Sequence, residues 1–303
     1  MKAAVIGIGS NSVRMRLAEI CGDQARRLMR DREGTRLFAG LDASGALAAD
    51  AMANTLGAVK RMADSARENG AEELAVFATS AVRDATNGSE FARWVQEETG
   101  VPLEIFSGEE EAALSFLGAT GGGHCGVVDI GGGSTEIVTG RGEQIHCAFS
   151  CQMGAVRLNR MIPIRSHEDL PLVEAAADAI LLEKLREHPA LTIPGTWIGT
   201  GGTFTSLAAL VRNVRWSACS HHGTVLTLEA VENQAWRLAD MPLEERLKLP
   251  GLQPHRADIV VHGIRILLAV MRRLGLASIR VSEYGNTEGY LKRRYHLQSD
   301  IAP

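Results

Sequence analysis

The stretch VVDIGGGSTEIV, from Val127 to Val138, places carboxylates on either side of three consecutive glycines and two hydroxyl residues. Successive backbone N–H groups in a glycine-rich turn form a concave site for an anion such as phosphate. Phosphate oxygens repel a carboxylate unless a cation lies between them, and Asp129 at a strand end is a suitable Mg²⁺ ligand, through water. Glu136 could hold the same metal or activate water, although an exposed strand position explains it equally well.

Two further glycine turns repeat this pattern. GIGSNS covers Gly7–Ser12, and GTGGT covers Gly199–Thr203 directly before a predicted helix, whose N-terminal dipole favours anions. A tight hairpin explains one such turn at least as often, but three at strand ends favour phosphate binding. None has Rossmann or Walker A spacing. The predicted phosphate-binding residues of the turns are Gly9, Ser10, Asn11, Ser12, Gly131, Gly132, Gly133, Ser134, Thr135, Gly201, Gly202 and Thr203.

The elements that must position these turns alternate between strands and helices. Strands are predicted at 3–8, 13–20, within 25–38, and at 74–78, 101–106, 126–129, two more up to about 150, then 198–202 and 279–282. Helices are predicted at 47–70, after Asn87 and Ser107, at about 168–188, 203–212, 229–240 and 255–274, and from 286. Glu90 and Glu110 follow Asn87 and Ser107 at capping-box spacing. The class is therefore α/β, with largely buried sheets.

The strand–turn–strand pattern occurs in both halves of the chain, which predicts two related domains. The glycine-rich segment 119–124 marks the joint, so we expect domains at 1–122 and 123–303. The C-terminal helix, at about 286–299, could pack back on the first domain. A cleft between two such domains is the default place for a binding site.

Composition limits the function classes. The chain has 303 residues, 45% of them hydrophobic, and a formal net charge of -4, so nothing global indicates a DNA- or RNA-binding protein. Five cysteines without a CxxC spacing predict reduced thiols and no zinc site. The apolar run 259–271 is interrupted by His262 and Arg265, which predicts a buried helix and no membrane span. No signal peptide precedes the first strand, so we expect a cytoplasmic location.

Several ordered motifs carry a resemblance to one family. They are GSNSVR, ATSAVRDATN, SGEEEAALSFLGA, DIGGGSTE, MGAVRL, GTGGT and the segment 241–263, which together span nearly the whole chain. The chain resembles the exopolyphosphatase / guanosine pentaphosphate phosphohydrolase (Ppx/GppA) family, in its short two-domain form. The resemblance implies two actin-like (ribonuclease H-like) domains with mixed sheets flanked by helices, and an active site in the cleft between them.

The resemblance also implies an activity and residue roles. It implies hydrolysis of a terminal phosphoanhydride of inorganic polyphosphate or pppGpp, with Mg²⁺ or alternatively Mn²⁺, and a homodimer. By position, Glu111 would be the base that activates water, and Arg14, Arg83 and Arg157 would hold phosphate. Without the resemblance, each residue has a simpler explanation. Glu111 would belong to a solvated acidic helix start, Arg83 would be a surface residue, and Arg157 would form a structural salt bridge.

Two departures from the family pattern bear on function. The first loop of the family reads Asp-x-Gly-Ser-Asn, and here the aspartate is Gly7. Near the C-terminus, Glu283, Asn286 and Thr287 stand where the family usually shows Asp, Leu and Arg. Because two carboxylates hold a hydrated Mg²⁺ better than one, Gly7 could lower activity and leave phosphate binding intact.

Three functions therefore compete. The first is a metal-dependent phosphoanhydride hydrolase. The second is a catalytically weakened member that binds polyphosphate or a guanosine polyphosphate as a sensor. The third is a kinase of the same superfamily. Phosphate release, ligand binding without turnover, and ATP-dependent phosphorylation distinguish them. The basic segment 291–296 could line a polyanion path, but a solvated helix end is the simpler interpretation.

Overall fold

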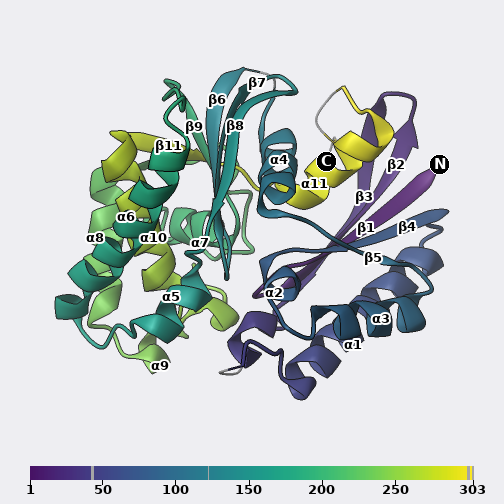
Figure 1. The fold of residues 1–303 in the computed structure, drawn as a ribbon, viewed down its shortest axis with the longest axis horizontal. Coiled ribbons are helices and arrows are strands. Elements are labelled where there is room, and N and C mark those ends of the chain that lie inside the picture. Colours follow the sequence, from purple (N-terminus) through teal and green to yellow (C-terminus); the bar gives the residue numbers. More distant parts are fainter. Residues whose placement is uncertain (42–43, 122, 299–300, 302–303) are drawn as a thin grey trace. The chain divides into compact units, whose positions relative to one another are not determined.

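The structure is a computed structural model, and it describes residues 1–41, 44–121, 123–298 and 301. The chain forms two compact units. Unit 1 comprises Met1–Gly121 and Asn286–Pro303, and unit 2 comprises Gly122–Gly285 (Figure 1). The domain boundary predicted at 122 falls on a residue outside the described ones, and the C-terminal helix belongs to unit 1.

Unit 1 is built on a mixed sheet with the strand order β3-β2-β1-β4-β5. Its strands are β1 (Lys2–Ile8), β2 (Val13–Cys21), β3 (Gln24–Glu33), β4 (Glu73–Ala78) and β5 (Leu103–Ile105). The hairpins β1–β2 and β2–β3 are antiparallel, whereas β1, β4 and β5 run parallel. Its helices are α1 (Ala49–Glu68), α2 (Ser80–Arg83), α3 (Gly88–Thr99), α4 (Gly108–Ala119) and α11 (Asn286–Tyr295).

Helix α11 completes unit 1, although 164 residues of unit 2 precede it in the sequence. It packs along α4 and against β1 and β2. Tyr290 and Leu291 share a buried apolar cluster with Ala3, Val5 and other residues of the sheet. Helix α1 packs against β1, β2 and α3. Helices thus bury most of the central strands β1, β2 and β4, whereas the edge strands β3 and β5 are largely exposed or half-buried.

Unit 2 has a mixed sheet with the order β10-β11-β9-β6-β7-β8. Its strands are β6 (His124–Ile130), β7 (Thr135–Arg141), β8 (Gln144–Cys151), β9 (Trp197–Thr200), β10 (Val225–Thr227) and β11 (Ser278–Val281). Five neighbouring strands of this sheet, β8-β7-β6-β9-β11, match β3-β2-β1-β4-β5 of unit 1. In both sheets the first two pairs are antiparallel and the last two pairs are parallel. The predicted relation between the two halves is therefore visible in their sheets.

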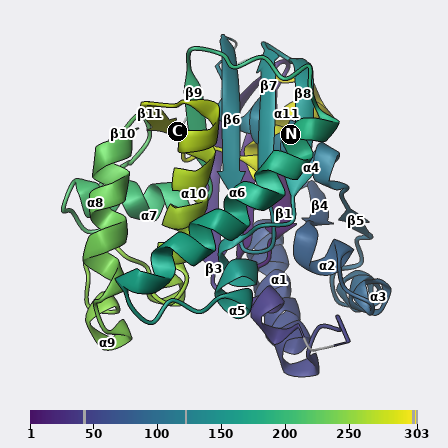
Figure 2. The ribbon, with the colours of Figure 1, turned by 60° about the vertical axis from the view of Figure 1, so that its left-hand side comes forward.

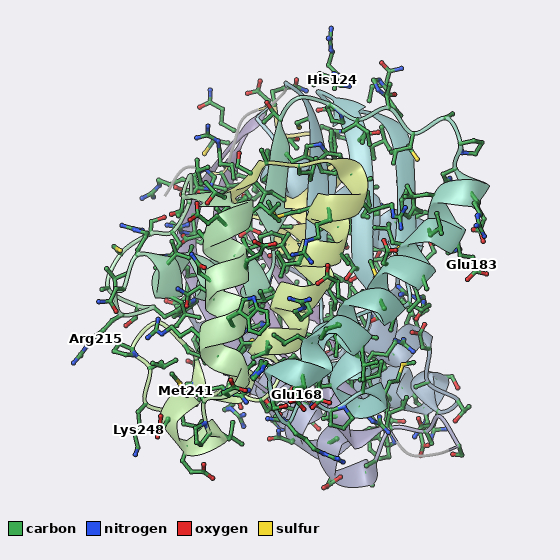
Figure 3. All side chains as sticks on the ribbon, turned by 90° about the vertical axis from the view of Figure 1, so that its left-hand side faces the viewer. His124, Glu168, Glu183, Arg215, Met241 and Lys248 are labelled. Atoms are coloured by element: carbon green, nitrogen blue, oxygen red, sulfur yellow. The ribbon has the colours of Figure 1, made fainter. Side chains whose placement is uncertain are left out.

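The helices of unit 2 cover its sheet. They are α5 (Ala155–Met161), α6 (Leu170–Glu187), α7 (Gly202–Val211), α8 (Leu228–Ala239), α9 (Leu243–Arg246) and α10 (Val260–Leu274). Helices α6 and α10 pack side by side (Figure 2), and α10 is buried along most of its length. The charged side chains of Glu183, Arg215 and Lys248 are exposed on the outside of this unit (Figure 3). Among the described residues, no helix combines the length and apolarity needed to cross a membrane.

Local predictions at the helix starts had different outcomes. The capping box at Ser107 is confirmed, because its side chain accepts from Glu110 N and the Glu110 side chain accepts from Ser107 N. The predicted capping box of Asn87 and Glu90 is wrong, because the Asn87 side chain makes no hydrogen bond to the start of the helix. Instead, Asn87 Oδ1 accepts from Leu47 N and its Nδ2 donates to Leu47 O. A tertiary partner thus replaces the local one.

Candidate active site

The turn between β6 and β7 brings two carboxylates together. Gly131 N donates to Ser134 O at 3.0 Å and closes the turn. In the antiparallel register, Asp129 lies directly opposite Glu136, so both side chains are on one face of the sheet, with Cβ atoms about 5 Å apart. Their exposures are 8% and 1%, which rules out the exposed-strand interpretation of Glu136. Glu136 Oε1 accepts a hydrogen bond from Ser150 Oγ at 2.8 Å.

Helix α5 orients the glycines of this turn. Ala155 N donates to Gly131 O, and the next two amides of the helix both donate to Gly132 O. Arg157 Nε donates to Gly133 O at 2.6 Å. In a trans peptide the N–H points away from the C=O of the same unit. The N–H groups that follow these three carbonyls therefore point away from α5, as a phosphate-binding turn requires.

Arg157 thus holds the turn itself, which is a different structural role from the salt bridge considered above. The turn also requires Gly154, because a Cβ there would lie 2.3 Å from the Gly132 carbonyl. The hydroxyl of Thr135 donates to Met153 O, so it too braces the turn.

The turn after β9 lies beside the first carboxylate. Thr200 is the parallel partner of Asp129 in the register of β9 and β6. Gly201 has φ 95°, and a Cβ there would lie 2.7 Å from Asp129 Oδ1. Helix α7 begins at Gly202, where it presents its N-terminal amides. Asp129, Glu136 and two glycine turns are therefore gathered at one end of the unit 2 sheet.

Arg256 is a residue of this site that the sequence interpretation missed. Its guanidinium carbon would lie 1.8 Å from a Cβ at Gly202, so the group rests directly on the start of α7. The side chain is 6% exposed. A buried arginine at a glycine turn is well suited to hold a phosphate oxygen. Only the family motif at 241–263 pointed to it.

The first turn, between β1 and β2, has a similar arrangement in unit 1. Gly9 N donates to Ser12 O at 3.1 Å. Ser10 O and Asn11 O accept from the amides of Phe38 and Arg36, so the following N–H groups point away from that segment. Ser10 Oγ lies 2.8 Å from Ser80 Oγ, at the start of α2. Ser10, Asn11 and Ser12 are buried.

Glu111 and Arg83 form an ion pair in unit 1. Arg83 Nη1 donates to Glu111 Oε2 at 3.0 Å and also to Phe106 O at 3.0 Å. Glu111 is 6% exposed, so it is not a solvated helix start, and the 18% exposure of the Arg83 side chain argues against a simple surface position. Because α2 runs from Ser80 to Arg83, the same short helix links this pair to the first turn.

Gly7 occupies a position without space for a side chain. A Cβ there would lie 2.7 Å from Phe77 Cζ and 3.1 Å from Thr287 Cγ2. Phe77 is 1% exposed and stacks on Tyr290 at a centroid distance of 5.5 Å. The aromatic ring thus fills the volume that an aspartate would need. Glu283, another departure from the family pattern, accepts a hydrogen bond from His221 N within unit 2.

The metal-binding groups of the site are few. Within the described ranges, no group of three or more His, Cys, Asp or Glu residues is arranged to hold a metal ion. Asp129 and Glu136 remain as a facing pair. That donor set suits Mg²⁺, which keeps several waters and takes one or two carboxylates together with substrate phosphates. All five cysteines are free, and burial, with a smaller contribution from Glu136, raises the pKa of Cys151 to about 12.

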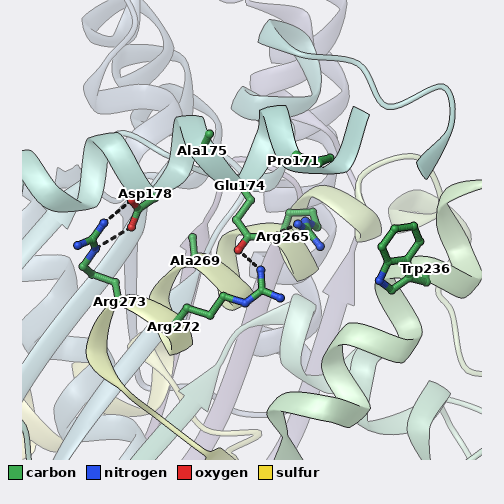
Figure 4. A pocket seen from close by; sticks show the side chains of 9 residues that line it. All are labelled: Pro171, Glu174, Ala175, Asp178, Trp236, Arg265, Ala269, Arg272 and Arg273. Carbon is green, nitrogen blue, oxygen red and sulfur yellow. Dashed lines mark hydrogen bonds and ion pairs between the residues drawn. The ribbon is translucent and has the colours of Figure 1, made fainter. Parts of the chain in front are cut away.

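A separate pocket lies among α6, α8 and α10 and contains none of the predicted site residues (Figure 4). Its volume is about 630 Å³. Its arginines are bound to carboxylates: Arg273 Nε donates to Asp178 Oδ1 at 2.8 Å, and Arg265 and Arg272 both pair with Glu174. This charge balance makes the pocket a poor phosphate site.

The basic end of α11 has structural partners. Lys292 Nζ donates to Thr120 O, the Arg293 guanidinium lies 5.1 Å from the Phe106 ring centroid, and Arg294 pairs with Glu73. These contacts favour the helix-end interpretation of the segment 291–296 over a polyanion path.

The chain is similar to known proteins in sequence and in fold. The model of the Ppx/GppA phosphatase family matches residues 18–297. Exopolyphosphatase 2 of Mycobacterium tuberculosis is 34% identical over 95% of this chain and 97% of its own. The Ppx-GppA enzyme of Aquifex aeolicus is 30% identical, with a TM-score of 0.80 over 96% of this chain and 98% of its own. An exopolyphosphatase from Cytophaga hutchinsonii, 24% identical, shares the fold with a TM-score of 0.89 over 100% of both chains.

Proposed function

Because the chain belongs to the Ppx/GppA phosphatase family, we propose that it is an exopolyphosphatase that releases the terminal phosphate of inorganic polyphosphate, with pppGpp as a second possible substrate. The observation that carries the proposal is the buried pair Asp129 and Glu136 beside the glycine turn of β6 and β7. Two carboxylates beside a phosphate-binding turn would repel the substrate, unless a cation between them and the phosphate neutralises the charge. Hydrolysis of a phosphoanhydride also depends mainly on positioning and charge neutralisation.

Each part of the site has a proposed role. Mg²⁺, or Mn²⁺, held by Asp129 and Glu136 would neutralise phosphate charge. The outward amides of the turns at 9–12, 131–135 and 201–203 would bind phosphate oxygens. Arg256 and Arg14 would hold further oxygens through their planar guanidinium groups.

Glu111 is the proposed general base. A buried carboxylate can accept a proton from water, and the bond from Arg83 fixes its orientation. This role is supported by burial and by the family position of the residue. Glu136 could activate water as well as hold the metal ion, which leaves it with two proposed roles.

A second candidate function is a sensor that binds the polyphosphorylated ligand without useful turnover. The observation that favours it is Phe77, which fills the place of the missing aspartate beside Gly7. Loss of one metal-proximal carboxylate can nevertheless reduce a rate without abolishing it.

The deciding experiment measures phosphate release from polyphosphate and from pppGpp, with Mg²⁺ and with Mn²⁺, for the wild type and Glu111→Gln. We expect turnover by the wild type and a loss of about 10²–10⁴-fold in Glu111→Gln. Calorimetric ligand binding without phosphate release would favour the sensor, and phosphorylation of an acceptor by ATP would favour a kinase. Light scattering of the same preparation tests the proposed homodimer.

A further inference from the structure

Helix α5 braces the glycine turn of β6 and β7 from a short stretch of chain. The helix runs only from Ala155 to Met161, and its hydrogen bonds to the turn come from its first three amides and from the Arg157 side chain. A helix of two turns is marginal by itself, because so few residues offset the cost of nucleation. The direction of the groups in the turn therefore depends on what fixes the far end of α5.

His262 of α10 binds that far end. Its Nε2 lies 2.9 Å from the carbonyl oxygen of Ile162, the residue that follows α5 as its cap. A carbonyl oxygen only accepts, so this nitrogen carries the proton. Burial lowers the pKa of His262 to about 4, so near pH 7 the ring is neutral and its one N–H is the group that binds Ile162. The imidazole thus satisfies a carbonyl at a helix end, where the helix itself offers no donor.

Packing of the core alone does not account for an imidazole at this position. The His262 side chain is 1% exposed, and no described residue is a hydrogen-bond partner of its Nδ1. A buried acceptor without a partner costs free energy, whereas an apolar side chain of similar size carries no such cost. The hydrogen bond from Nε2 to Ile162 is a contribution that an apolar residue could not make.

The helix that carries His262 also contacts the other glycine turn of unit 2. The next residue, Gly263, packs so closely on Thr203 that a Cβ at Gly263 would lie 2.5 Å from Thr203 Oγ1. Thr203 belongs to the first turn of α7, directly after the glycine turn that follows β9. Arg256, just before α10, rests on Gly202. The chain around the start of α10 therefore contacts the supports of both turns.

We infer that His262 is a positioning residue, which holds the far end of α5 and thereby fixes the direction of the amides in the turn Gly131–Thr135. This inference rests on the proposed function, because that function assigns a phosphate to this turn. Asp129 and Glu136 are placed by the pairing of β6 with β7 and not by α5. Loss of the His262 hydrogen bond should therefore impair the use of phosphate substrates and leave metal affinity unchanged.

The test compares His262→Met with the wild type, because methionine is apolar, fills irregular space and has no N–H. With polyphosphate and Mg²⁺, kcat/KM for phosphate release should fall about tenfold, as expected for one lost buried hydrogen bond. Mn²⁺ affinity, measured by electron paramagnetic resonance, should stay within about twofold. Hydrogen exchange of the Ala155, Val156 and Arg157 amides, followed by NMR, should become about tenfold faster.

His262→Gln is the conservative variant. The amide nitrogen of glutamine can take the place of Nε2 and donate to Ile162 O, so phosphate release and amide exchange should return to the values of the wild type. The side chain of His262→Asn is too short to reach this carbonyl, so that variant should behave like His262→Met. It serves as the second variant if His262→Met fails to fold.

The matched control is His221→Met. His221 is also 1% exposed, but its Nε2 binds Trp216 O, at 2.8 Å, instead of the end of α5. In urea denaturation this variant should lose as much stability as His262→Met, and it should keep the phosphate release and α5 amide exchange of the wild type. Equal effects in the two methionine variants, an unchanged His262→Met, or no recovery in His262→Gln would overturn the inference. Absence of phosphate release by the wild type, with the difference in amide exchange intact, would overturn only the proposed function.

Discussion

The hairpins β1–β2 and β6–β7 have turns that close with the same hydrogen bond, from Gly9 N to Ser12 O in one and from Gly131 N to Ser134 O in the other. The pair of residues that flanks the turn differs. In the first hairpin this pair is Gly7 and Arg14, and in the second it is Asp129 and Glu136. One hairpin therefore carries a cation beside its turn, and the other carries two anions.

The difference teaches that one backbone can serve two kinds of charge recognition. Both turns direct amides away from the segment that braces them, through the same peptide geometry. In the proposed function, the flanking side chains decide whether the turn binds phosphate directly or together with a metal ion. In unit 1, the Phe77 ring occupies the space beside Gly7. A single substitution at Gly7 therefore cannot give the first hairpin the flanking carboxylate of the second without a steric clash.

The largest expected effect comes from removing the negative charge of the second hairpin. Asp129→Asn keeps the shape of the side chain but weakens the proposed metal site, so phosphate release should fall about 10³-fold. Mn²⁺ binding, measured by electron paramagnetic resonance, should weaken in parallel. The corresponding change in the first hairpin, Arg14→Gln, should raise KM and leave Mn²⁺ affinity unchanged. Equal metal affinity in Asp129→Asn and the wild type would contradict the comparison.

Making the first hairpin resemble the second should cost stability. Gly7→Asp forces a side chain against Phe77 and should lower the free energy of unfolding by about 1–3 kcal/mol, with no gain in activity. Urea denaturation measures the change. In Gly7→Asp/Phe77→Val the ring is absent, so the two changes should couple favourably by about 1 kcal/mol. Strictly additive effects would show that the ring is not the obstacle.

An effect of similar size should distinguish the units at acid pH. His262 in α10 is 1% exposed, its Nε2 lies 2.9 Å from Ile162 O, and burial lowers its pKa to about 4. Arg246 opposes protonation of this imidazole and Asp258 favours it. The unfolded chain binds a proton below about pH 6.5 and the folded chain only below about pH 4, so stability falls as the pH drops through this window.

At pH 5 this difference amounts to about 2 kcal/mol. Hydrogen exchange should show that α10 and β6 lose protection between pH 7 and pH 5, whereas β1 and β2 lose less. His262→Gln removes the titration and should flatten the pH dependence of unit 2. An unchanged pH dependence in that variant would assign the acid sensitivity to other groups.

The sequence predicted features that depend on near neighbours. The turns at Gly7–Ser12 and Asp129–Thr135, the capping box at Ser107 and the long apolar helix around His262 are local patterns, and the structure has all of them. Family membership and the α/β class followed from the order of such patterns. The assigned roles of Glu111 and of the phosphate-binding residues stay predictions until they are measured.

Other features depend on contacts between distant residues and were not visible in the sequence. Phe77 lies 70 positions from Gly7, and Arg256 lies 54 positions from Gly202, yet each pair is in direct contact. The cross-strand pairs Arg14–Arg32 and Arg16–Arg30 required the register of β2 and β3. Asn87 has capping-box spacing, but its amide binds Leu47 instead. Tertiary packing decided each of these cases.

The return of α11 to unit 1 has a consequence for biosynthesis. Unit 2 is continuous in sequence, so the ribosome delivers all of it before the segment Asn286–Pro303 emerges. The first part of unit 1, Met1–Gly121, lacks Tyr290, Leu291 and Leu297 of its apolar cluster until that segment emerges. Domains usually complete their folding in order from the N-terminus. Here we expect unit 2 to finish folding first, and the nascent part of unit 1 to keep an apolar surface until α11 covers it.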